Sequence, residues 1–127
     1  MQVSIMSELE NCFQIIATSN KRHDEISSTY QALIKLFEGR KEILILQDFR
    51  RLETVLSLVE FDAILRLCKA AGVKKLRVAT LTHDMSRAFT GVLVQEISEK
   101  YGINLELNYG ADVEMAKNWL RTVNDQA

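Results

Sequence analysis

The chain has 127 residues, of which 47% are hydrophobic and 26% charged, and its 16 basic and 17 acidic side chains leave a formal net charge of −1. This size and composition fit one globular domain and exclude a disordered or fibrous chain. The near-zero charge argues against a dedicated nucleic-acid-binding protein, and no apolar run reaches the roughly 18 residues of a membrane span. The N-terminus lacks the pattern of a secretory signal, so the two cysteines are predicted to be free thiols of a cytoplasmic protein.

Two short segments near the N-terminus have the composition of β-strands. Residues 3–9 place Val3, Ile5, Ser7 and Leu9 on one face with a period of two, and residues 12–18 are rich in apolar and β-branched side chains. Glu10 and Asn11 between them fit a tight turn, and strands so close together pair antiparallel. The sequence therefore predicts an N-terminal β-hairpin.

A helix and a central strand are predicted next. Asp24 is a suitable N-cap, and behind it apolar residues recur at three- and four-residue steps until Gly39 ends the pattern. Residues 43–46 are apolar on both faces of a strand, which is typical of a strand in the middle of a sheet.

Residues 53–71, ended by a glycine, predict a second helix with an unusually wide apolar surface. Apolar side chains cover well over half of its circumference, whereas a helix packed on one sheet needs a stripe of about 100°. We expect Leu58, Phe61 and Leu65 to contact either a second subunit or a neighbouring helix of the same chain. A homodimer is the favoured arrangement, because twofold dimers are the commonest closed assembly.

The rest of the chain continues to alternate between strand and helix patterns. Strands are predicted at residues 75–81 and 103–107, the second of them half-exposed at an edge, and helices at residues 84–101 and 113–123. Strands separated by helices imply parallel pairing with right-handed crossovers. The predicted fold is α/β, with a mixed, mostly parallel five-stranded sheet, an N-terminal β-hairpin and four helices.

Several segments resemble the STAS domain (sulfate transporter and anti-sigma-factor antagonist), and more closely its SpoIIAA-like bacterial branch, which is compared with SEC14-type lipid-binding folds. The resemblance is carried by residues 43–53, which follow the family's strand ending in an Asp-Leu pattern, by Val78 and Ala79 in the next strand, and by residues 111–120, which end in Trp-Leu. It extends over nearly the whole chain and implies a single SpoIIAA-like domain at residues 1–127.

The phosphorylation motif of that family is not present in this sequence. Anti-sigma-factor antagonists carry Asp-Ser-Ser-Gly where the second helix begins, and the kinase modifies a hydroxyl there. Residues 53–59 read Glu-Thr-Val-Leu-Ser-Leu-Val, and Thr54 and Ser57 are hydroxyls near that place without matching the motif. The resemblance therefore implies a protein that is not switched by such a kinase.

Four residues form the candidate ligand-binding site, because ligands of open α/β sheets bind beyond the carboxyl ends of the parallel strands. They are Asp48, Thr82, His83 and Asp84. Asp48 is either a site carboxylate or a turn residue that accepts backbone N–H groups. His83 and Asp84 form either an oriented acid–base pair or an exposed loop residue beside a helix cap, and the helix N-terminus there favours at most weak anion binding.

The sequence predicts no catalytic residue, no metal and no cofactor. The two histidines and two cysteines lie far apart, and the five glycines form neither a dinucleotide-binding nor a P-loop motif. Residues 39–77 carry nine basic and five acidic side chains. This charge excess is either the solvated surface of helices or a patch that meets an acidic partner or an anionic headgroup.

Three functions remain compatible with the sequence. The favoured one is a small cytoplasmic, non-enzymatic domain that acts by protein–protein interaction or regulation, as a homodimer or with another protein. The alternative is a small-molecule or lipid carrier with an apolar pocket between helices and sheet. The third is an enzyme that uses Asp48, His83 and Asp84. Bound ligand in native mass spectra would indicate the carrier, and loss of turnover on His83→Ala would indicate the enzyme.

Overall fold

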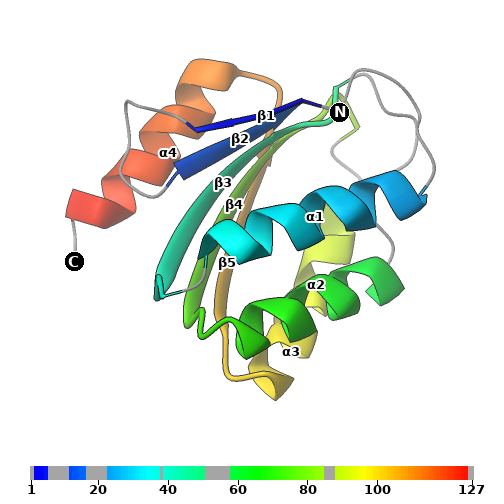
Figure 1. The fold of residues 1–127 in the computed structure, drawn as a ribbon. Coiled ribbons are helices and arrows are strands. Elements are labelled where there is room, and N and C mark those ends of the chain that lie inside the picture. Colours follow the sequence, from blue (N-terminus) through cyan, green and yellow to red (C-terminus); the bar gives the residue numbers. More distant parts are fainter. Residues whose placement is uncertain are drawn as a thin grey trace.

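The computed structural model describes residues 2–5, 12–16, 23–37, 39–50, 58–84 and 88–125. Within these ranges helices and strands alternate after the first two strands (Figure 1). The strands are β1 (Gln2–Ile5), β2 (Cys12–Ile16), β3 (Glu42–Asp48), β4 (Lys75–Leu81) and β5 (Asn104–Gly110), and the helices are α1 (His23–Phe37), α2 (Leu58–Ala70), α3 (Ala88–Lys100) and α4 (Val113–Asp125).

Strands β2 to β5 form a four-stranded, all-parallel sheet in which the strands follow one another in chain order. Every crossover therefore advances in the same direction, and right-handed crossovers place their helices on the same face. Figure 1 shows α1, α2 and α3 together on one face of the sheet and α4 alone on the other. We call these the three-helix face and the α4 face.

The predicted N-terminal hairpin is wrong in its register. A turn at Glu10 and Asn11 would place Val3 opposite Thr18, whereas the structure pairs Val3 with Ile15. The alternating pattern of a strand shows which of its residues share a face, but only the connection decides which residue of the next strand lies opposite. The predicted turn itself lies outside the described residues.

The predicted fold class is corrected accordingly. The expected mixed sheet built on a tight hairpin is replaced by a four-stranded, all-parallel sheet of β2 to β5 with four helices, and β1 lies only as a short antiparallel addition at its edge. Strand β1 is a four-residue segment that lies antiparallel to the outer side of β2. Its bounds are Gln2–Ile5, and residues 6–9 of the predicted strand lie outside the described residues.

The larger part of the core lies between the sheet and the three-helix face. The central strands β3 and β4 are buried on both sides, and for β3 the apolar run of residues 43–46 predicts this. Their side chains on this face pack with those of all three helices. The buried members of this cluster include Phe13, Ile15, Leu33, Ile45, Leu65, Val78, Val94 and Leu105.

Gly72 and Gly102 end α2 and α3 where the sequence predicts, and the two helix ends share one pattern of hydrogen bonds. The N–H groups of Gly72 and Val73 donate to the carbonyl oxygens of Lys69 and Cys68 at 3.1 and 3.0 Å, and Gly102 begins the matching pair of bonds after α3. Both glycines have positive φ, 87° and 69°, which a Cβ atom would strain. These joints turn the chain directly from each helix into the next strand.

A smaller cluster fastens α4 to the opposite face of the sheet. Leu44, Leu46, Ala79 and Leu81 from the two central strands pack against Leu120 and its neighbours on α4. Asp112 caps the helix, because its carboxylate accepts the N–H of Met115 at 3.0 Å. Within the described residues, none of the helices has the length and apolar character that a membrane span requires.

Candidate functional site at the carboxyl ends of the strands

The parallel register brings the predicted site residues to one edge of the sheet. Asp48, Leu81 and Gly110 lie side by side as the last residues of β3, β4 and β5. Beyond them the Phe49 N–H donates to the Leu81 carbonyl at 2.9 Å, and the Thr82 N–H donates to the Gly110 carbonyl at 2.7 Å. The backbone ladder thus continues past the strands and fixes Asp48 and Thr82 as neighbours at this carboxyl edge.

Asp48 is held by the arginine two residues further along the chain. The backbone N–H of Arg50 donates to Asp48 Oδ1 at 3.2 Å, its Nε donates to the same oxygen at 2.9 Å, and its Nη2 donates to Oδ2 at 2.8 Å. This hydrogen bonding raises the pKa of Arg50 above its ordinary value. The structure therefore supports the turn interpretation of Asp48, in which the carboxylate is neutralised locally by a bidentate partner.

The three residues after β4 form a tight local turn. Thr82 is buried, and its hydroxyl oxygen accepts the backbone N–H of Asp84 at 3.1 Å. His83 and Asp84 are both exposed. The described part of α3 begins at Ala88, and residues 85–87, on which the predicted cap at Asp84 depends, lie outside the described residues.

One level below this edge, a chain of buried polar side chains crosses the three-helix face. Tyr30 of α1 donates its hydroxyl to Gln47 Oε1, and Gln47 Nε2 donates to Thr80 Oγ1 at 3.0 Å. All three side chains are buried. Tyr109 lies beside Thr80 on β5, at the same level of the sheet. Buried amides and hydroxyls require hydrogen-bond partners, and these side chains provide them for one another inside a mainly apolar core.

The ionisable groups of this face are held in their neutral forms. Burial raises the pKa of Tyr30 far above its ordinary value and also raises that of Tyr109. Burial likewise raises the pKa of the Cys68 thiol to about 12. These groups keep their protons at neutral pH, and the Tyr30 hydroxyl donates its proton in the hydrogen bond to Gln47.

Nothing in the described ranges gathers three or more metal-ligating side chains into one place. The four predicted ligand-binding residues are brought to one edge, but Asp48 is neutralised by Arg50 and the Thr82 hydroxyl is bonded to the backbone. The arrangement orders a turn and the ends of the strands.

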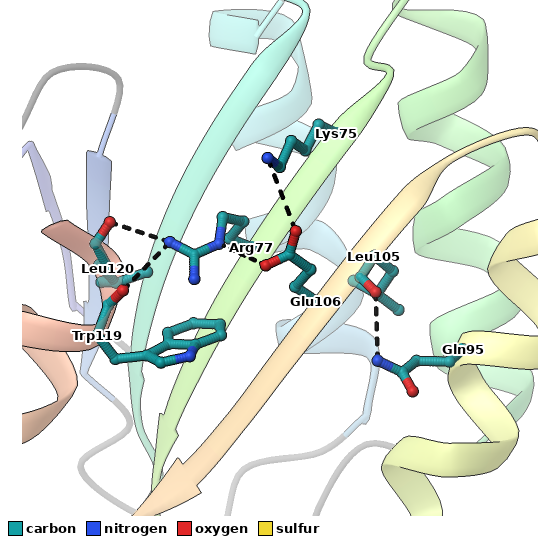
Figure 2. Close-up of polar contacts among 7 residues, drawn as sticks. All are labelled: Lys75, Arg77, Gln95, Leu105, Glu106, Trp119 and Leu120. Atoms are coloured by element: carbon teal, nitrogen blue, oxygen red, sulfur yellow. Dashed lines mark hydrogen bonds and ion pairs between the residues drawn. The ribbon is translucent and has the colours of Figure 1, made fainter. Parts of the chain in front are cut away.

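A second polar cluster, which was not predicted from the sequence, lies on the α4 face (Figure 2). The Arg77 side chain is 0% exposed. This arginine is therefore not part of any surface patch formed by the basic residues of the segment 39–77. Arg77 Nε donates to Glu106 Oε2 at 3.0 Å, and Nη1 donates to the carbonyl oxygens of Leu120 and Trp119 at 3.0 and 3.3 Å. Lys75 Nζ lies 3.7 Å from the other oxygen of Glu106.

Signals for both polar clusters are present in the sequence. Gln47 follows Ile43 and Ile45 on the same face of an otherwise apolar strand, and Arg77 interrupts another such strand. A polar side chain at a core position needs a partner nearby, so each position predicts a buried hydrogen bond. The partners come from elements too distant in sequence for that signal to name them.

The predicted interface on α2 is largely part of the chain's own core. Leu65 is 0% exposed, and Phe61 is partly buried against the same cluster. Leu58 at the start of the helix is partly exposed, and the most exposed apolar side chain is its neighbour Val59, at 79%. Of the two predicted alternatives, Leu65 therefore has the one within the same chain.

The physical reason is the place of α2 between two other helices. It packs against α1 on one side, against α3 on the other and against the core below, so its apolar surface is wider than one sheet requires. On the α3 side, the Tyr101 hydroxyl donates to Asp62 Oδ1 at 2.6 Å. This places α2 in the alternative considered from the sequence, contact with neighbouring helices of the same chain.

Comparisons with protein-family models, with curated proteins and with solved structures found no match for this chain. The resemblance to the STAS domain therefore stays a prediction from the sequence.

Proposed function

We propose that this chain is a small, non-enzymatic binding domain of SpoIIAA-like type that acts through contacts with another protein. One observation carries the proposal. At the carboxyl edge, where open α/β proteins hold ligands, the site residues Asp48 and Thr82 and the buried Gln47 are each bonded to another group of the same chain. Because the polar groups of these residues are already hydrogen-bonded within the chain, their arrangement supports a structural role rather than ligand binding.

Apolar side chains on the outer helices supply a surface for such a contact. Val59 of α2 and Leu93 of α3 are 79% and 48% exposed. Apolar anchors of this kind contribute most to protein–protein binding when a partner excludes water from them. Because the sequence lacks the phosphorylation motif of the family, we propose that binding does not depend on phosphorylation of Thr54 or Ser57, which lie outside the described residues.

The experiment compares protein crosslinking in cells for three forms of the chain. Val59→Glu places a charge in the proposed contact, and it suits the first turn of a helix, where the dipole favours a carboxylate. Gln31→Glu adds the same charge at an exposed position of α1 and is the matched control. We expect one protein to be crosslinked by the wild-type chain and by Gln31→Glu, and to be lost with Val59→Glu.

Two outcomes contradict the proposal. One is a crosslinking pattern that is the same for all three forms. The other is a stoichiometric small molecule bound to the purified chain in native mass spectra, which would favour the small-molecule or lipid carrier.

A further inference from the structure

The outer edge of β5 carries backbone groups that point away from the sheet. Within the described part of the chain, β5 is the last strand in the sheet order and pairs with β4 alone. The Asn104 N–H donates to the Lys74 carbonyl at 2.9 Å, and the Gly110 carbonyl accepts the Thr82 N–H at 2.7 Å. Even-numbered residues of β5 therefore direct their backbone groups toward β4. Because these directions alternate along a strand, the odd-numbered residues direct theirs outward.

One of the outward groups is already covered by a side chain. Gln95 of α3 reaches over the edge, and its Nε2 donates to the Leu105 carbonyl at 3.3 Å (Figure 2). The outward N–H and C=O groups of Leu107 and Tyr109 lie further along the same edge. They form a short template to which another extended strand can bond.

The sequence of this edge contains none of the usual features that prevent strand pairing. Strand β5 reads Asn-Leu-Glu-Leu-Asn-Tyr-Gly, without proline or lysine. Its one charged side chain, Glu106, points to the α4 face and is bonded to Arg77 and Lys75. Val92, which is 59% exposed, lies one helical turn before Gln95 on the same side of α3. An exposed apolar side chain thus borders the open edge.

We propose that a second copy of this chain pairs with β5, antiparallel and about a twofold axis at Leu107. This arrangement continues the sheet of one copy into that of the other and closes the assembly. Leu107 lies opposite the second copy's Leu107, and their outward N–H and C=O groups bond to each other. Leu105 lies opposite the second copy's Tyr109, and its outward N–H donates to the Tyr109 carbonyl while its own carbonyl stays bonded to Gln95.

The charges of β5 fit this register. Side chains that lie opposite each other share a face of the sheet, so Glu106 meets the second copy's Asn108 on the α4 face, twice by symmetry. No two like charges within β5 face each other in this register. On the other face, pairing covers the partly exposed side chains of Leu107 and Tyr109. The proposal concerns a surface distinct from Val59 and does not depend on the proposed function.

Asn108 provides a test in which one position receives charges of both signs. Asn108→Glu places two carboxylates opposite each other at two symmetric sites, whereas Asn108→Lys places a cation opposite Glu106 at the same sites. We expect the wild-type chain to form a concentration-dependent dimer in sedimentation velocity. The dissociation constant should rise at least about tenfold in Asn108→Glu, and it should stay equal or fall in Asn108→Lys. Circular dichroism verifies that both variants are folded.

Hydrogen exchange gives a second measurement on the unmodified protein. The amides of Leu105 and Leu107 should become protected as the concentration is raised, while the Asn108 amide, which points toward β4, should be protected at every concentration. A chain that stays monomeric up to about 0.5 mM, where a dimer even of weak-interface affinity would be populated, overturns the proposal. A dimer of the same affinity in both variants, or a Leu107 amide insensitive to concentration, also overturns it.

Discussion

The indole ring of Trp119 lies over the guanidinium of Arg77, with 4.0 Å between Arg77 Cζ and the ring centroid. The same guanidinium donates to the backbone carbonyls of Trp119 and Leu120. The Arg77 side chain of β4 thus holds α4 through both the Trp119 ring and the backbone carbonyls of that helix (Figure 2). The geometry fixes the position of the helix along the sheet more specifically than the small apolar cluster beneath it, because each hydrogen bond and the stacked ring require one alignment.

Replacing this arginine by lysine should destabilise the fold. Arg77→Lys keeps the positive charge but loses the planar group that stacks on Trp119 and bonds three acceptors. A buried charge with incomplete partners is costly, and we expect unfolding to become easier by about 2–4 kcal/mol in urea denaturation. The matched control is Arg66→Lys, because Arg66 is an exposed arginine that is paired with Asp62. An equal denaturation midpoint for wild type and both variants would show that Arg77 does not hold α4.

The buried chain of Tyr30, Gln47 and Thr80 should behave as one unit. Tyr30→Phe leaves Gln47 Oε1 without its donor, and Gln47→Met leaves both hydroxyls without their partner. Each single variant should lose about 1–3 kcal/mol of stability. The double variant should lose clearly less than the sum, since its remaining groups no longer need each other. Additive losses in a double-mutant cycle would mean that the two side chains act independently.

The stability of the protein should fall in alkaline solution. Burial raises the pKa of Cys68 from 9.0 to about 12, so between these values the unfolded chain loses a proton that the folded chain keeps. Stability therefore decreases as pH rises above 9, by about 1.4 kcal/mol per pH unit for one such group. Tyr30, whose pKa is also raised by burial, adds to the decrease above pH 10.

Denaturation curves at pH 8, 9, 10 and 11 measure this dependence. Cys68→Ala lowers stability at every pH but should remove the Cys68 contribution to the slope, so that its curve falls less steeply than that of the wild type between pH 9 and 10. Parallel curves for the two proteins would show that Cys68 titrates normally in the folded state.

Two neighbouring positions of α2 separate a core role from an interface role. Phe61 packs against the core, whereas Val59 is exposed. Phe61→Asp should therefore unfold the chain or cost about 3 kcal/mol of stability, and Val59→Asp should leave the thermal midpoint almost unchanged. A Phe61→Asp protein that keeps the wild-type thermal midpoint and only loses its partner in sedimentation would restore the interface predicted from the sequence.

Local patterns predicted the elements that depend on local physics. The central strand β3 follows from a run that is apolar on both faces, and the helix ends at Gly72 and Gly102 follow from the need for positive φ. The edge position of β5 follows from its half-polar composition. In each case the information lies within one segment.

Pairings between distant segments were not predictable in the same way. The register of β1 on β2 is not set by the pattern within either strand, and the wide apolar surface of α2 left open whether a second subunit or helices of the same chain cover it. Arg77 and Trp119 are 42 residues apart, and no local pattern links them. At the candidate site, the register of parallel strands predicted the meeting of Asp48 and Thr82, but not that Arg50 would neutralise the carboxylate.

The strict chain order of β2 to β5 has a consequence for synthesis on the ribosome. Each newly emerged strand finds its only inner neighbour already made, so the sheet can grow by addition at one edge as translation proceeds. Helix α4 does not follow this order of assembly, because it packs on residues of β3 and β4 and over the Arg77–Glu106 pair, all of which are synthesised before it. Until α4 emerges, Leu44, Leu46 and Leu81 face water in a nascent chain whose other face is already closed. That interval is the stage at which a chaperone that recognises apolar surface would have its target.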